Sequence, residues 1–208
     1  MIYTSPKIKQ YRRYRNAGVV LHQKIIDEYV DDQIIGQAAR ELGLGEDHVL
    51  DLEKEDELSI LMEYALHEIE VDGMSLVEKY QKEVGGKNRV ERELLSAKIN
   101  APTGLFLVED IHSERCIVEL VDLTDENREI ELTDINFSQS KIGDVVLFFR
   151  PTELSEFTTT SGVSFVFSGD MKEELKEKWN QWESLSSAER YAKIFKLHKS
   201  KGIPTLYV

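Results

Sequence analysis

The fold class is decided by residues 104–133, which read GLFLVEDIHSERCIVELVDLTDENREIELT. Apolar runs rich in β-branched and aromatic residues alternate here with polar turns at residues 112–114 and 124–127. This alternation is typical of strands joined by hairpins. Two further apolar runs follow before residue 169. We therefore predict five strands, at Leu105–Ile111, Cys116–Leu123, Arg128–Leu132, Val145–Arg150 and Val163–Ser168.

These strands are expected to form a small five-stranded antiparallel β barrel or a curled sheet. An open meander of this length would leave two edges of unpaired backbone groups, and closure removes them. The sequence leaves both arrangements open.

The residues before this stretch predict helices. Leu21, Ile25 and Tyr29 recur at four-residue spacing, and Val19 and Val20 widen this apolar stripe, so we expect the whole stripe to be buried. The next helix is predicted at Asp32–Leu42, and Gly43 should end it. Further helices are predicted from Asp56 to about Asp72, at Ser75–Glu83 and at Asn88–Lys98.

The order of these elements predicts an α+β protein with three parts. Residues 1–102 form a helical region, residues 103–169 a small β module, and residues 170–208 a C-terminal helical extension packed on the rest. In the extension, Asp170 can cap one helix, and Ser186 with Glu189 forms a capping box for the last one.

Composition limits the classes of function. The net charge is −13, but residues 1–24 carry six basic and no acidic side chains, whereas residues 25–185 carry 15 basic against 38 acidic ones. An acidic body repels polyanions, although a basic end could still contact one. Cys116 is the only cysteine, and no apolar run reaches the length of a membrane span. We expect a cytoplasmic protein that does not act at a membrane.

A basic N-terminal segment is the first candidate binding site. Its five cations, interleaved with Tyr11 and Tyr14, could grip phosphates and stack bases. The alternative is a solvated helix face whose cations pair with the acidic body. The candidate contacts for an anion or a nucleic acid are Lys7, Lys9, Arg12, Arg13 and Arg15.

A second nucleic-acid signal lies at residues 34–44, IIGQAARELGL, which resemble the first helix and turn of a helix-turn-helix domain. A recognition helix should follow, with basic or amide side chains that reach base edges. Residues 46–57 instead carry seven acidic side chains and one lysine, Lys54. The interpretation therefore lacks its confirming context.

Catalytic, cofactor and metal sites are not predicted. The five histidines are scattered without the spacing of helical metal ligands. Gly85-Gly86-Lys87 lacks the pattern of a phosphate-binding loop, and Cys116 lies in an apolar strand where thiols are usually inert. Acidic pairs such as Glu109-Asp110 arise by chance among 39 carboxylates. We expect no cofactor.

Trp179 and Trp182 are the second candidate contact surface, because they lie three residues apart on one helical face. They could anchor a protein interface, or the helix could use them to dock on the β module.

Several segments together resemble a family of uncharacterised prokaryotic proteins: residues 55–65 (EDELSILMEYA), 86–92 (GKNRVER), 105–108 (LFLV), 118–123 (VELVDL) and 143–147 (GDVVL). The resemblance covers about residues 20–169. It implies a helical N-terminal half joined to a small β module, and it implies no activity.

The sequence thus predicts a fold more firmly than a function. Patterned hydrophobicity and a polarised charge, without site chemistry, favour a non-enzymatic interaction or adaptor module with an unidentified protein partner. The alternative is nucleic-acid binding through the basic N-terminal segment or the β module.

Overall fold

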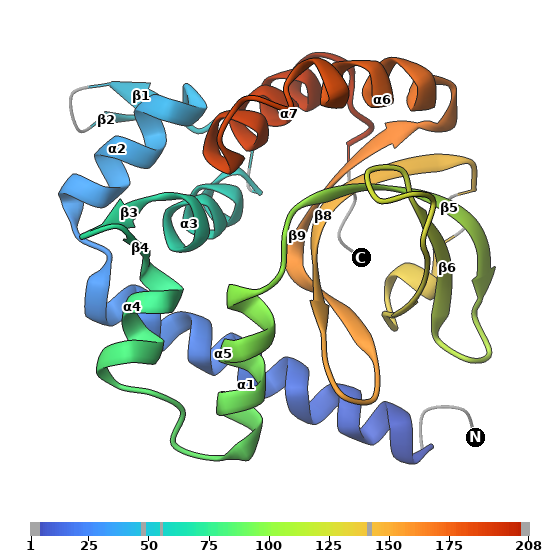
Figure 1. The fold of residues 1–208 in the computed structure, drawn as a ribbon, viewed down its shortest axis with the longest axis horizontal. Coiled ribbons are helices and arrows are strands. Elements are labelled where there is room, and N and C mark those ends of the chain that lie inside the picture. Colours follow the sequence, from blue (N-terminus) through green and yellow to red (C-terminus); the bar gives the residue numbers. More distant parts are fainter. Residues whose placement is uncertain (1–4, 47–48, 55, 141–142, 205–208) are drawn as a thin grey trace. The chain divides into compact units, whose positions relative to one another are not determined.

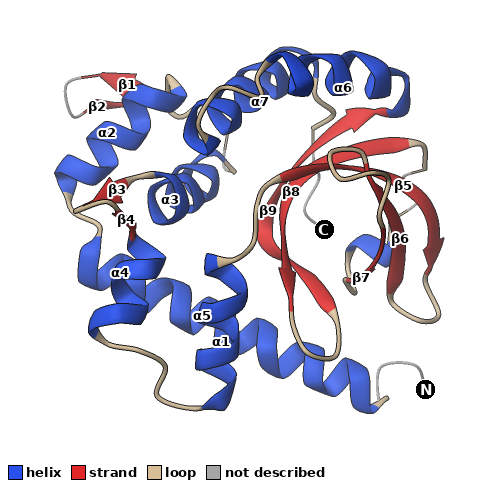
Figure 2. Cartoon of the chain, in the orientation of Figure 1, coloured by secondary structure: helices blue, strands red, loops and turns tan. Residues whose placement is uncertain are grey.

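The computed structural model describes residues 5–46, 49–54, 56–140 and 143–204 (Figure 1). The chain divides into two compact units. One comprises Arg13–Asn100, and the other comprises Ala101–Val208 together with the residues up to Arg12. The predicted boundary at residue 102 falls next to this division. Figure 2 shows that the first unit is mainly helical and that the long strands belong to the second.

The helices lie close to their predicted ranges. Asp31 caps α2 by accepting a hydrogen bond from the Ile34 amide, and Gly43 ends it in the left-handed conformation that glycine favours. Ser75 forms a capping box with Glu78 at the start of α4. The helices of the first unit are α1 (Pro6–Tyr29), which begins in the second unit, α2 (Asp32–Leu42), α3 (Glu57–Glu68), α4 (Leu76–Glu83) and α5 (Arg89–Ile99).

Short hairpins replace the helix that a DNA-reading motif would need. Strands β1 (Gly45–Glu46) and β2 (Val49–Leu50) pair directly after α2. A second hairpin joins β3 (Glu70–Val71) to β4 (Met74–Ser75). The turn after α2 therefore leads into a hairpin and not into a recognition helix. His48 and Glu55, which belong to the segments considered above, lie outside the described residues.

The apolar stripe of α1 is narrower than predicted. Leu21 and Ile25 are fully buried, whereas Val19 and Val20 are 66% and 53% exposed. A four-residue period places Leu21 and Ile25 on one side of the helix, and Val19 and Val20 lie too far around its circumference to share that side. The prediction that these two valines are buried was wrong.

Polar contacts tie the helices of the first unit together. Tyr14 on α1 donates a hydrogen bond to Glu93 on α5 at 2.7 Å. Lys24 on α1 forms an ion pair with Glu91 on α5 at 2.9 Å. Glu91 also accepts the backbone amide of Lys87 at 2.8 Å, which fixes the turn before α5. The segment GKNRVER, which carries part of the family resemblance, is thus the start of α5 and its link to α1.

The β module is a closed barrel with strand order β5-β6-β7-β9-β8. Alternate residues of its strands point inward, and Phe106, Leu120, Leu132 and Phe149 belong to the buried core. The strands are β5 (Gly104–His112), β6 (Ile117–Asp122), β7 (Glu129–Thr133), β8 (Val145–Glu153) and β9 (Thr158–Ser168).

Closure decides between the two predicted arrangements. Strand β8 pairs with β5, and β9 pairs with β7, where Leu132 lies opposite Thr158. The β7–β9 pair is parallel, while the other neighbouring pairs are antiparallel. The predicted closed barrel is confirmed, but it is mixed and not antiparallel throughout, because the β8–β9 hairpin places β9 beside β7 in the same direction.

Strands β8 and β9 are longer than predicted. The predicted strand ended at Arg150, and the next residue, Pro151, cannot donate a ladder hydrogen bond. In the structure the register of β8 and β9 shifts between Phe149 and Pro151, so the proline sits at an irregularity that tolerates it. Strand β8 continues to Glu153, and strand β9 begins at Thr158, five residues before its predicted start.

Two C-terminal helices, α6 (Lys172–Gln181) and α7 (Ser187–Lys201), pack on the barrel (Figure 1). The Tyr191 ring on α7 contacts the rings of Phe148 and Phe165 at centroid distances of 5.5 and 5.4 Å. Ser186 and Glu189 form the predicted capping box of α7. Across the described residues, no helix combines the length and the apolar character that crossing a membrane requires.

Two glycines allow a test of the helical unit. A Cβ at Gly86 would lie 2.5 Å from the Arg92 nitrogen and 2.8 Å from its Cα, so the backbone of α5 would have to move. We expect Gly86→Ala to lower the free energy of unfolding by about 1–3 kcal/mol. Chemical denaturation measures this change.

The matched control is Gly18→Ala in α1, where an added Cβ meets nothing within 4 Å. Alanine is the better helix former, so this variant should gain about 0.5–1 kcal/mol. Equal effects of the two substitutions would contradict the described start of α5.

Candidate functional site

The predicted basic segment is part of helix α1. Arg12 and Arg13 are exposed, but the two tyrosines between the cations are buried. Tyr11 packs edge-on against Phe157 at a centroid distance of 5.9 Å, and Tyr14 is bonded to Glu93. These rings serve the internal packing and are not available for stacking bases. Among the described residues of α1, Lys9, Arg12 and Arg13 are exposed and Lys7 and Arg15 are partly exposed, and neither Tyr11 nor Tyr14 offers these cations an exposed ring.

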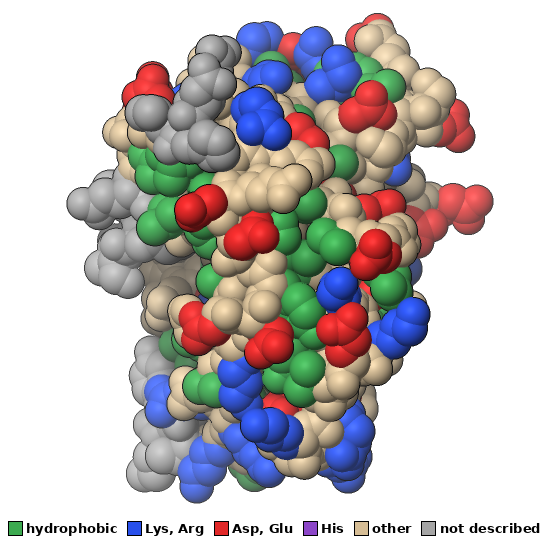
Figure 3. Space-filling model, turned by 90° about the vertical axis from the view of Figure 1, so that its left-hand side faces the viewer, with side chains coloured by type: hydrophobic (Ala, Val, Ile, Leu, Met, Phe, Trp, Pro, Cys, Tyr) green, Lys and Arg blue, Asp and Glu red, His purple; other side chains and the backbone are tan. Residues whose placement is uncertain are grey.

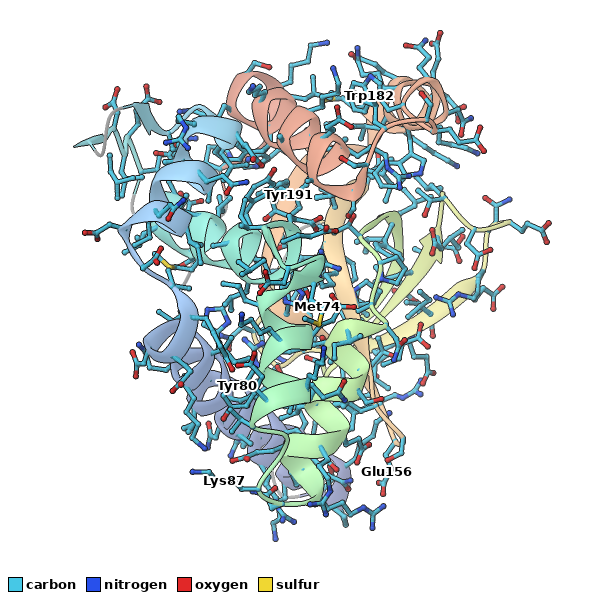
Figure 4. The ribbon with its side chains drawn as sticks, turned by 60° about the vertical axis from the view of Figure 1, so that its left-hand side comes forward. Met74, Tyr80, Lys87, Glu156, Trp182 and Tyr191 are labelled. Atoms are coloured by element: carbon cyan, nitrogen blue, oxygen red, sulfur yellow. The ribbon has the colours of Figure 1, made fainter. Side chains whose placement is uncertain are left out.

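The two tryptophans differ in their surroundings. Trp179 lies beside Phe148 of the barrel and under the Arg190 guanidinium, 4.8 Å from the ring centre. Trp182, at the end of α6, lies near Lys178 and Lys193 (Figure 4). Both rings are half-buried. Trp179 thus docks α6 on the barrel, and an interface role for Trp182 stays a prediction.

A group of ionisable side chains lies inside the helical unit. Glu63 and Lys98 are 2% and 5% exposed. His67 Nε2 lies 3.8 Å from Glu63 Oε1, one helical turn away. Burial, followed by the charge of Lys98, lowers the pKa of His22, and Glu63 opposes this shift. Because burial disfavours the charged form of His22, the protonation of this residue opposes folding.

The outer surface of the barrel carries a row of carboxylates. Asp110 on β5 lies opposite Glu119 on β6, and Glu119 lies opposite Glu131 on β7. Because Ile111, Val118 and Ile130 pack in or against the core, their neighbours Asp110, Glu119 and Glu131 point outward. Like charges directly opposite each other destabilise a sheet. We call these three residues the carboxylate row.

Two basic groups adjoin the carboxylate row. His112 Nε2 lies 2.7 Å from Glu119 Oε1 and 3.8 Å from Asp110 Oδ2. Arg115 lies 3.4 Å from Glu131 in an exposed ion pair. Exposed pairs of this kind contribute little to stability. Three carboxylates lie here beside one histidine and one arginine, so carboxylates remain in the majority on this surface.

The wider segment strengthens this character. Residues 104–133 contain nine acidic side chains and two arginines, Arg115 and Arg128. Arg128 is itself paired, at 3.6 Å with Asp125 and at 2.9 Å with Glu153. The view in Figure 3, by contrast, shows many basic side chains, gathered mainly along its lower edge, as well as acidic ones. A rigid acidic sheet surface of this kind attracts cations.

The alternation of residues along β6 and β7 is a sequence signal of this row. Glu129 and Glu131 alternate with buried residues, and Glu119 does the same on the neighbouring strand. The period of two identifies these side chains as outward-facing. Their alignment across three strands depends on register, which the sequence does not state.

Comparisons with known proteins give a family and no activity. A family model described as "Family of unknown function (DUF7986)" matches residues 5–208. Searches of curated proteins and of solved structures found no match.

The lowered pKa of His22 predicts how stability depends on pH. As the pH falls below the ordinary histidine value of 6.5, the unfolded chain binds a proton that the folded chain resists. Stability should therefore fall as the pH drops from about 7.5 to about 5.5, and His22→Gln should lose less stability over this range than the wild type. Urea denaturation at both pH values measures the difference. Parallel losses in the two proteins would contradict a lowered pKa of the partly buried His22.

Proposed function

Since the chain belongs to the DUF7986 family, whose function is unknown, we propose a function from the physical chemistry of the barrel: the outer surface of β5, β6 and β7 binds a cationic segment of a partner protein. The partner segment is one rich in lysine and arginine. The carboxylate row is the observation that carries this proposal.

The geometry of the row supports recognition. Asp110, Glu119 and Glu131 are held by registered backbone pairing on three adjacent strands, so their spacing is set before a partner arrives. Neighbouring strands lie about 4.8 Å apart, so the row extends across the strands over roughly 10 Å. A rigid site loses little conformational freedom on binding. Opposite charges also accelerate encounter with the partner.

The electrostatic repulsion among the three carboxylates in the free protein supports the same proposal. Three carboxylates in consecutive cross-strand positions repel one another, and His112 and Arg115 offset this repulsion only at its two sides. A cationic partner removes the repulsion when it binds. Binding is then favoured both by the loss of this repulsion and by the new ion pairs with the partner.

The same charges disfavour nucleic acid on this surface. Small five-stranded barrels of the OB type bind oligonucleotides on the face of their second and third strands. In this chain those strands are β6 and β7, whose outward residues Glu119, Glu129 and Glu131 repel phosphates. The nucleic-acid alternative then depends on the cations of α1, whose neighbouring tyrosines are buried.

The test measures binding of a fluorescent peptide rich in lysine and arginine by anisotropy. We expect salt-sensitive binding by the wild type and at least about tenfold weaker binding by a Glu119→Gln, Glu131→Gln double variant, because two of the facing charges are lost. Glutamine keeps the size of each side chain, and both positions are partly exposed, so the fold should persist.

The matched control removes two exposed carboxylates from elsewhere in the same unit, by Glu173→Gln and Glu183→Gln. It changes the net charge equally and should bind like the wild type. Equal weakening in both double variants would show that net charge alone attracts the peptide, and the proposal would fail. Tight binding of a single-stranded oligonucleotide, abolished by Arg12→Gln, Arg13→Gln and Arg15→Gln, would favour the alternative instead.

A further inference from the structure

We propose that Asp110, His112 and Glu119 bind one divalent transition-metal ion, and that Zn²⁺ fits this site best. Asp110 and Glu119 belong to the carboxylate row, and His112 lies beside them on the same outer barrel surface. The proposal does not depend on a partner protein, because the metal alone is the ligand.

Two strands bring the three side chains together. Asp110 lies opposite Glu119, and His112 lies two residues further along β5 on the same face. The pairing of β5 with β6 shifts between Val108 and Asp110, which marks a bulge at Glu109. Beyond this bulge, Ile111 packs against the core, and its two neighbours point outward.

The three side chains lie within reach of one metal ion. One potential ligand atom of each residue lies within 4.8 Å of the other two. Ligands bound tetrahedrally to zinc at about 2.0–2.1 Å are separated from one another by roughly 3.3 Å. The distance from His112 Nε2 to Glu119 Oε1 is 2.7 Å and that to Asp110 Oδ2 is 3.8 Å, so the required value lies between them. To form the site, the first of these distances has to lengthen and the second has to shorten.

The donor set indicates the class of metal. One imidazole nitrogen and two carboxylate oxygens suit zinc and neighbouring transition metals, whereas Mg²⁺ and Ca²⁺ prefer oxygen ligands throughout. Three protein ligands leave a fourth position for water. His112 and Glu119 are only partly exposed, and both belong to strands, which hold ligands more rigidly than loops do.

The negative charge of the neighbouring carboxylates favours the binding of a divalent cation. Asp110 and Glu119 repel each other across the strand pair, and Glu131 adds a third carboxylate beside Glu119. A bound metal neutralises the first two charges. Arg115 engages Glu131, which therefore stays outside the ligand set.

The linear spacing of the histidines could not predict this site. His112 is the only histidine in it, and Glu119 is seven positions away on another strand. Only the register of β5 and β6 makes them neighbours.

The test titrates Zn²⁺ into the metal-free full-length protein by calorimetry, without peptide. We expect one ion per chain, with affinity lowered at least tenfold by His112→Ala and by Glu119→Gln. His22→Gln, which removes a histidine from the helical unit, and Glu173→Gln should bind Zn²⁺ like the wild type. Circular dichroism confirms that each variant is folded. In the ¹H–¹⁵N spectrum, Zn²⁺ should shift the His112 ring signals.

Three results would overturn the proposal: no Zn²⁺ binding at millimolar concentration, unchanged binding by His112→Ala, or Mg²⁺ binding as tight as that of Zn²⁺. His112→Ala also separates the two proposals, because it removes a metal ligand and leaves the carboxylate row intact. Peptide binding should survive in this variant when metal binding is lost.

Discussion

The structure of the barrel depends on its closure. Closure determines, for each residue of a strand, whether its side chain points into the barrel or outward. Once β9 joins β7 at Thr158 and Leu132, and β8 joins β5, each ladder has one permitted register. Large apolar residues such as Phe106 and Phe149 then fill the interior. A slip of one residue would bury carboxylates and expose this core. The same constraint that packs the aromatic rings therefore aligns Asp110, Glu119 and Glu131 on the outside.

The carboxylates of the two units are used differently. In the helical unit, Glu91 and Glu93 accept hydrogen bonds from side chains of α1 and so connect helices. Lys24 and the Lys87 amide lower the pKa of Glu91, so this carboxylate stays ionised within its contacts. On the barrel, Glu119 and Glu131 also have basic neighbours, His112 and Arg115, but the row in addition places three carboxylates opposite one another, which costs stability and connects no helices. That contrast is the reason for assigning function to the barrel surface.

Local patterns predicted much of the fold. The ends of α2 follow from Asp31 and Gly43, and the start of α7 follows from the capping box at Ser186, because these signals act between near neighbours in the chain. The five strands follow from composition and turns. The prediction for Val19 failed although a local signal existed, because the four-residue period of Leu21 and Ile25 already places Val19 on another side of the helix.

The candidate site was largely hidden from sequence reasoning because it is built from register. Glu119 and Glu131 are twelve residues apart in the chain and opposite each other in the sheet. The basic segment of α1 shows the reverse case. Its cations and tyrosines are adjacent in sequence, yet folding directs Tyr11 and Tyr14 into packing contacts and leaves Arg12 and Arg13 exposed.

The central claim is that the outer surface of β5–β7 is the binding surface of this protein. The most direct test follows the backbone amide signals of the ¹⁵N-labelled wild type by NMR while a peptide rich in lysine and arginine is added. Our account predicts shifts concentrated at Asp110, Glu119, Glu131 and their strand neighbours. Shifts centred on the helical unit, or spread evenly over all exposed acidic residues, would contradict it.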